Sequence, residues 1–205
     1  MKKASTFTYV VGDGIYINLT NKCSNRCEFC IRQNADGAYG SDSLWLEREP
    51  TVEEVLADLD RRDMTKFSEA VFCGYGEPTY RLDDMLKIAK EIKRRYGMKT
   101  RLNTNGHTSL IHGFDTSPAF EGALDSISIS LNAPNADRYN EICHPVYKNS
   151  AYFSLLDFAK NVKKYVQNVS FSVVRDFLSE EEIESCRKIA DEIGVTLRVR
   201  DYISS

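Results

Sequence analysis

Residues 23–30, Cys-Ser-Asn-Arg-Cys-Glu-Phe-Cys, place three of the chain's six cysteines within eight positions. They follow an alternating apolar run at residues 15–19, which predicts a strand leading into a cysteine loop. Thiolates spaced C-x3-C-x2-C can converge on one soft metal centre, usually zinc or an iron–sulfur cluster. A closed zinc site or an ordinary four-iron cluster takes four protein ligands. Because the next cysteine is Cys73, the loop predicts a metal centre with one open coordination position.

The spacing resembles the signature of the radical SAM enzymes, in which an aromatic residue, here Phe29, precedes the last cysteine. The resemblance implies that Cys23, Cys27 and Cys30 hold a 4Fe-4S cluster whose open iron chelates S-adenosylmethionine (SAM). It also implies reductive cleavage of SAM to methionine and a 5′-deoxyadenosyl radical that abstracts hydrogen from a substrate. The electron would come from a low-potential donor of the flavodoxin or ferredoxin type. The alternative is a zinc site with a distant histidine ligand, namely His107, His112 or His144.

Composition predicts one globular domain over residues 1–205, since 42% of the residues are hydrophobic and 28% are charged. A net charge of −3 gives no indication of bulk electrostatic binding to nucleic acid. No apolar run is long enough to span a membrane, and no apolar core follows Met1-Lys2-Lys3 as in a signal peptide. Clustered cysteines in such a chain favour metal ligands over disulfides, so we expect a cytoplasmic protein.

Strand and helix patterns alternate along the chain. Residues 6–11 and 15–19 flank Gly12-Asp13-Gly14 and predict an N-terminal hairpin. Later strands are predicted at 70–73, 99–103, 126–131, 169–174 and 196–202. Helices are predicted from Thr51, over 82–96, briefly around 116–123, over 151–166, and from Ser179 to Gly194.

Six such units predict parallel strands with right-handed crossovers and cannot close an eight-stranded barrel. The patterns alone leave an open barrel and a flat doubly wound sheet as alternatives. The radical SAM resemblance implies the first, an α/β fold that is a partial (β/α)6 TIM-like barrel with a small N-terminal β-hairpin extension.

The chemistry of α/β barrels lies at the carboxyl ends of the strands. After the strand at 70–73, Gly74-Tyr75-Gly76-Glu77-Pro78 resembles the family's G-G-E-P motif. The resemblance implies that Gly74, Gly76 and Glu77 lie near the methionyl ammonium of SAM. Tyr75 splits the usual glycine pair, and the alternative is a turn that merely needs glycine.

The following strand ends supply further candidates. Leu102–Gly106 looks like the L-D-T-N-G segment of glycyl-radical activases, which implies that Asn103 and Asn105 bind the cofactor. Ser130 and Asn132 match positions where the activases carry charged cofactor contacts. Arg175, just past the strand at 169–174, is a candidate partner for the methionyl carboxylate or a solvated surface arginine.

Three residues outside these motifs could bind the substrate or take part in its reaction. Arg198 and Arg200 share a face of the last strand and could hold an acidic group, although charges also protect edge strands. Cys143 is a candidate hydrogen-atom donor or a small buried apolar residue.

The resemblance covers about residues 15–200 and is closest to a short TatD-linked radical SAM group, which names no substrate. It rests on the runs Ile17–Cys23, Leu44–Pro50 and Ser128–Pro134. We therefore expect a radical SAM enzyme acting on a peptide, a protein or a small acidic metabolite, with glycyl-radical activation as the nearest named activity. The alternatives are a non-catalytic zinc-binding module and a SAM-binding sensor.

Overall fold

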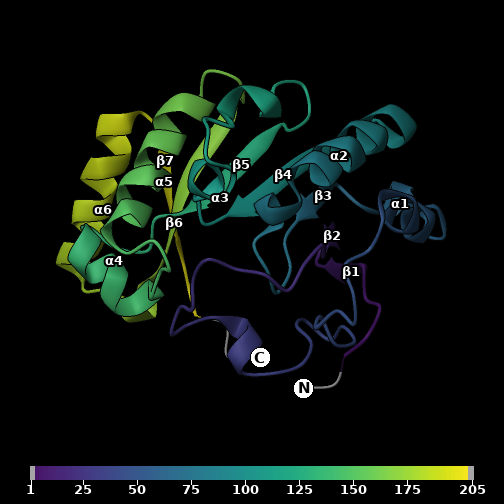
Figure 1. Ribbon diagram of the computed structural model, residues 1–205, viewed down its shortest axis with the longest axis horizontal. Helices are drawn as coiled ribbons and strands as arrows, with labels where there is room; N and C mark the ends of the chain where they lie inside the picture. The colour runs from purple at the N-terminus through teal and green to yellow at the C-terminus, as the bar shows by residue number, and fades with distance from the viewer. Residues whose placement is uncertain (1–2, 203–205) are drawn as a thin grey trace.

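The computed structural model describes residues 3–202, which form one seven-stranded sheet in the order β1 to β7. β1 (Thr8–Val11) pairs antiparallel with β2 (Gly14–Ile17), so the predicted hairpin is confirmed. The other strands run parallel to β2, and they are β3 (Glu69–Phe72), β4 (Lys99–Thr104), β5 (Ser126–Ser130), β6 (Asn168–Val174) and β7 (Thr196–Arg200). Within residues 3–202 no pairing joins β7 to β1, so the sheet is an unclosed barrel, as expected (Figure 1).

Helices connect the parallel strands and cover one face of the sheet (Figure 1). They are α1 (Val52–Asp60), α2 (Leu82–Tyr96), α3 (Thr108–His112), α4 (Ala136–Cys143), α5 (Asn149–Val162) and α6 (Glu180–Ile193). Thr51 and Ser179 form capping boxes at the starts of α1 and α6, as their sequences predicted. None of the helices in the described part of the chain is both long and apolar enough to cross a bilayer.

Two α-helices, α3 and α4, were not predicted, and one segment predicted as a helix is a 3-10 helix. α3 and α4 are only five and eight residues long, too short to give a clear apolar periodicity. The helix expected around 116–123 is a 3-10 helix, η4 (Ser117–Phe120), which contains Pro118 and is followed by Gly122. Four further 3-10 helices lie in loops: η1 (Ile31–Gln33), η2 (Met64–Lys66), η3 (Pro78–Arg81) and η5 (Arg175–Phe177).

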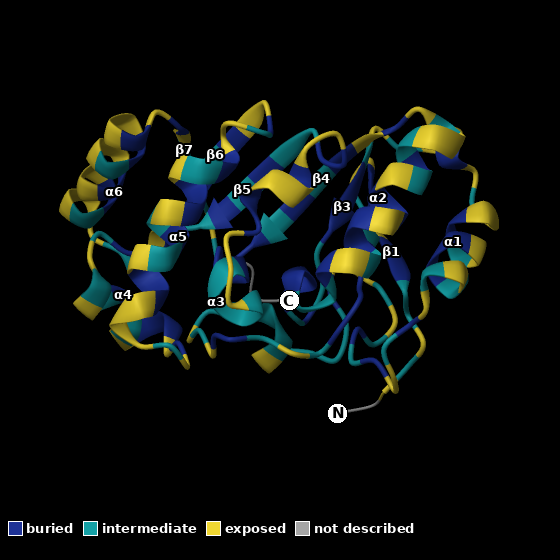
Figure 2. Cartoon of the chain, turned by 45° about the horizontal axis from the view of Figure 1, so that its top comes forward, coloured by how far each residue is buried: buried dark blue, intermediate teal, exposed yellow. Residues whose placement is uncertain are grey.

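Alternate residues of each strand face two different environments. One set packs against the helices in a continuous apolar core and includes the fully buried Phe72, Leu102 and Phe171. Burying a side chain of this size contributes about 1.5–3 kcal/mol. Figure 2 shows the same division, with buried strands under helices whose outer faces are exposed. The other set points away from the helices, is largely polar, and borders a cavity.

Candidate functional site: a cysteine loop beside a polar cavity

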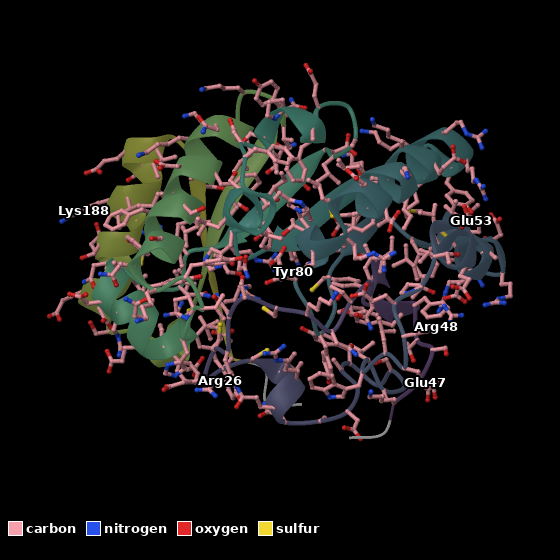
Figure 3. All side chains as sticks on the ribbon, viewed as in Figure 1. Arg26, Glu47, Arg48, Glu53, Tyr80 and Lys188 are labelled. Atoms are coloured by element: carbon pink, nitrogen blue, oxygen red, sulfur yellow. The ribbon has the colours of Figure 1, made fainter. Side chains whose placement is uncertain are left out.

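The inner face of the sheet borders a cavity of about 660 Å³ at the carboxyl ends of the parallel strands. Cys23, Cys27 and Cys30 line one side of it, on the loop after β2. Figure 3 shows sulfur atoms grouped between the labelled Arg26, in this loop, and Tyr80. The cavity is also lined by the other residues predicted to bind cofactor, with one exception: Phe29, Gly74, Gly76, Glu77, Asn103, Asn105, Ser130 and Asn132. The structure therefore brings these residues into one site.

Buried hydrogen bonds anchor the cysteine loop from behind. Asn105 Nδ2 donates to Ser24 Oγ at 2.9 Å, and Asn25 Nδ2 donates to the hydroxyl of Tyr139 at 2.8 Å. The His107 ring lies between them, with Nδ1 2.9 Å from Ser24 Oγ and Nε2 3.1 Å from the Tyr139 hydroxyl. All five side chains are buried. The loop conformation is therefore fixed by the protein itself.

Glu77 joins the ends of β3 and β4. Its Oε1 accepts from the backbone N–H of Thr79 at 3.2 Å, the Thr79 hydroxyl at 2.8 Å and the Thr104 hydroxyl at 2.8 Å. Its Oε2 accepts from the backbone N–H of Asn105 at 2.8 Å. Burial raises the pKa of this carboxyl, while the four hydrogen bonds oppose that rise. Glu77 thus holds Asn105 in place, and its contact with a methionyl ammonium stays a prediction.

Gly74 and Gly76 allow the chain to approach the segment that enters the cysteine loop. A Cβ atom on Gly76 would lie 2.2 Å from the backbone oxygen of Thr20, and one on Gly74 would lie 2.1 Å from Asn18 Oδ1. Tyr75, the departure from the family motif, packs edge-on against Trp45 with ring centroids 5.2 Å apart. The motif therefore has a packing role here, whatever its carbonyl groups bind.

The three histidines do not complete a zinc site. Both ring nitrogens of His107 are engaged, and burial lowers its pKa to about 3. His112 Nε2 lies 2.8 Å from the Thr79 oxygen, and His144 Nε2 lies 3.3 Å from Glu28 Oε1. Across residues 3–202, no three His, Cys, Asp or Glu side chains are placed to share one metal ion. A structural zinc needs that convergence, whereas each thiolate of a 4Fe-4S cluster binds a different iron.

The surroundings of the half-buried cysteine thiols disfavour their ionised form. Burial raises the pKa of Cys23 to about 12 and also raises that of Cys30. Loading of a cluster must therefore displace protons from the loop. Three such thiols beside a cavity at the strand ends fit a cluster that leaves one iron open.

Two candidates lie outside the cavity lining. Cys143 is fully buried at the end of α4, where its thiol contacts that of Cys27 and raises the Cys27 pKa. Arg175 lies in η5 with an exposed side chain, 3.5 Å from Glu180 and 3.6 Å from Asp201. The strand-end rule thus located Arg175 along the chain, but η5 places it outside the cavity.

Sequence reasoning missed the residues that support the loop. Ser24 and Asn25 lie between the first two cysteines but were given no role, Tyr139 lies in no motif, and His107 was considered only as a zinc ligand. The one available signal was the position of His107 directly after Asn105-Gly106, at the end of β4.

Comparison with known proteins agrees with a three-cysteine site for an iron–sulfur cluster. The model of the Radical SAM superfamily matches residues 17–189. The probable dual-specificity RNA methyltransferase RlmN of Caldanaerobacter subterraneus subsp. tengcongensis is 28% identical over 174 residues, 82% of this chain and 46% of that protein. GTP 3',8-cyclase of Clostridium perfringens is 26% identical over 188 residues, 91% of this chain and 54% of that protein. The chain thus spans about half the length of the curated relatives it matches.

A solved structure shares the fold. Streptococcus suis SuiB, bound to its precursor peptide SuiA, superposes with a TM-score of 0.66 over 92% of this chain and 39% of SuiB, at 16% identity. The two curated relatives are named as an RNA methyltransferase and a cyclase, so they do not support the glycyl-radical activation expected from residues 102–106.

Proposed function

The chain belongs to the radical SAM superfamily, whose members use a 4Fe-4S cluster and SAM, and from this we propose that it cleaves SAM to abstract hydrogen from a substrate. One observation carries the proposal. The three cysteines of an anchored loop line the same cavity as the strand-end residues predicted to bind SAM. The alternative of a zinc-binding module lacks a histidine free to complete its ligand set.

The chain's own residues would bind and orient the reactants. Cys23, Cys27 and Cys30 would hold the cluster, and the backbone at Gly74 and Gly76 would face the methionyl ammonium. When bound, the cluster supplies the electron that splits SAM into methionine and a 5′-deoxyadenosyl radical, which takes hydrogen from the substrate. Phe29, whose ring lies 5.1 Å from that of Phe177, would shield the cluster from water.

Polar residues on β4 and β5 would orient the rest of the cofactor. Asn103, Asn105, Ser130 and Asn132 offer uncharged donors and acceptors that suit ribose hydroxyls and the methionyl group. Asn132 has a left-handed backbone with φ of 57°, which turns the chain at the end of β5. Neither Arg175 nor Cys143 has a part in this scheme, because neither lines the cavity.

The identity of the substrate is a separate proposal. The relatives are named for RNA methylation and GTP cyclisation, and SuiB was solved with a peptide, but this chain covers only part of each. We propose that residues 1–205 are a radical SAM core that acts in the cytoplasm on a peptide, a protein or a small acidic metabolite. A flavodoxin or ferredoxin would supply the electron. Membership of the TatD-linked group rests on the sequence runs alone. Glycyl-radical activation has no support from the names of the curated relatives.

Anaerobic reconstitution tests the function. The wild-type chain should bind about four irons and release 5′-deoxyadenosine from SAM under a strong reductant. Cys27→Ala should lose both properties. Cys186→Ala is the matched control, because it removes a buried thiol from α6 that is not on the cysteine loop. Bound zinc without labile sulfide would contradict the proposal, and SAM binding without cleavage would indicate a sensor.

A further inference from the structure

We propose that Arg198 and Arg200 of β7 form an anion subsite that binds a phosphate group of the substrate. This inference deepens the proposed function, on which it rests, by naming the chemical class of the substrate. Both arginines line the same cavity as the three cysteines. A phosphate held at β7 would therefore direct the rest of the molecule toward the cysteine loop.

The strand register points both arginines into the cavity. Arg198 lies opposite Ser172, and Arg200 lies opposite Val174, and both of these β6 residues also line the cavity. The alternating residues Leu197 and Val199 pack against the apolar core, although Val199 also borders the cavity. The two guanidinium groups are therefore presented on one face of one strand, at the edge of the open sheet.

Arg101, which also lines the cavity, is neutralised by a carboxylate of the protein. Its Nη2 lies 2.6 Å from Glu69 Oε1, its Nε lies 3.0 Å from Glu69 Oε2, and its Nη1 donates to Asn103 at 2.7 Å. Arg101 therefore carries its own counter-charge. It is available to orient Asn103 but adds little net charge to the cavity.

Arg198 and Arg200 have no such partner. No carboxylate of the described residues lies within ion-pair distance of either one, although Asp201 is adjacent and pairs with Arg175 at 3.6 Å. The other carboxylate in the cavity lining, Glu77, already accepts four hydrogen bonds. Moreover, Arg200 Nε is buried and has no hydrogen-bond partner in the described structure.

Arg198 is exposed, whereas Arg200 is partly buried. An unpaired, partly buried guanidinium such as that of Arg200 destabilises a fold, so its presence requires a compensating interaction. Burial also lowers the pKa of Arg200, which reflects the same unfavourable desolvation of its charge. A bound oxyanion would supply both the missing acceptor and the missing charge. Guanidinium groups bind oxyanions with two parallel hydrogen bonds, which gives direction as well as affinity.

The number of unpaired charges favours phosphate over carboxylate. Two arginines leave two positive charges without a counter-charge. A phosphate monoester carries about −1.5 to −2 at neutral pH, whereas a carboxylate neutralises only one of them. The hydroxyl of Ser172, on the neighbouring strand β6, offers a neutral hydrogen bond beside Arg198 without adding charge.

Phosphate binding to the reconstituted protein tests the subsite, with inorganic phosphate as the probe and chloride used to hold the ionic strength constant. Phosphate should raise the melting temperature of the wild-type protein, because it binds the folded state. Arg198→Gln and Arg200→Gln should each weaken phosphate binding about 10-fold or more, as expected for loss of a charged hydrogen bond. Arg200→Lys keeps the positive charge but cannot form two parallel hydrogen bonds, so its phosphate affinity should lie between those of the wild type and Arg200→Gln.

Arg187→Gln is the matched control, because Arg187 is an exposed arginine of α6 that pairs with Glu184. It should bind phosphate as the wild type does. Equal phosphate affinity in Arg200→Gln and the wild type would overturn the proposal. So would weaker SAM binding in Arg200→Gln with phosphate affinity unchanged, because the arginines would then serve the cofactor's carboxylate. Deoxyadenosine release is measured separately, so phosphate binding without SAM cleavage would refute the proposed function and leave the subsite standing.

Discussion

Acidification from about pH 8 to about pH 5 should destabilise the folded chain through one side chain, His107. Its imidazole is fully buried between Ser24 and Tyr139, and burial lowers its pKa from the ordinary value of 6.5 to about 3. Between these two values the unfolded chain binds a proton that the folded chain does not. The stability that comes from the neutral ring is therefore complete above pH 6.5 and is lost progressively as the pH falls toward 3.

The two pKa values set the size of the effect. At pH 5, proton linkage lowers the free energy of unfolding by about 2 kcal/mol relative to a chain without this group. His107→Gln supplies that reference, because an amide can donate and accept hydrogen bonds but does not titrate. Urea unfolding of both proteins at the two pH values gives the comparison.

Tyr139→Phe is the control for a disturbed network. It removes the hydroxyl that contacts His107 and Asn25 but leaves the imidazole, so it should lower stability by about 1–3 kcal/mol yet keep the pH dependence. The chain has three histidines, so the ring protons of His107 can also be followed by NMR. Parallel pH profiles for the wild type and His107→Gln, or a His107 midpoint near 6.5 in the folded protein, would refute the reasoning.

Three further substitutions test the site. Gly76→Ala should lower the iron content after reconstitution, because its Cβ would lie 2.2 Å from the Thr20 oxygen. Gly97→Ala is the control: it strains a left-handed residue at the end of α2, where the added Cβ meets no other atom, and it should keep its iron. Equal iron contents in the two variants would contradict this. Cys143→Ala should keep its iron and its deoxyadenosine release, since Cys143 is not on the cysteine loop and takes no part in the hydrogen bonds that anchor Ser24 and Asn25. Glu77→Gln should cost about 1–3 kcal/mol in urea unfolding, because its amide would face donors alone. An unchanged unfolding midpoint would show that the carboxylate is dispensable.

The parts of the fold that depend on local sequence were predictable. The capping boxes at Thr51 and Ser179, the hairpin at Gly12 and the glycine ends of α2 and α6 each depend on residues within one turn of the chain. α4 escaped prediction because only Tyr139, Ile142 and Cys143 of its eight residues are buried, too few to show a helical period.

The candidate site also has parts that could be predicted from the sequence and parts that could not. The placement of Gly76, Glu77 and Asn105 around one cavity was predictable, because parallel strands deliver their carboxyl ends to one edge of the sheet. The support behind the cysteine loop was not, because Ser24 and His107 are 83 residues apart in the chain. Nothing in either local sequence identifies the other as its partner. Proximity of Cys143 to Cys27 depends likewise on the packing of α4 behind the loop.

The two walls of the cavity are built differently, and this difference makes their roles separable. The cysteine wall is tied to Asn105 and Tyr139 by buried hydrogen bonds, so the loop is held in place without a ligand. The β7 wall presents two arginines without protein counter-charges, although Arg101 shows that this same cavity can pair an arginine with Glu69. Substitution of Asn105 or Tyr139 should therefore change iron content and SAM binding together. Substitutions at Arg198 or Arg200 should change neither, and a loss of iron in either variant would show that the two walls form one cooperative unit.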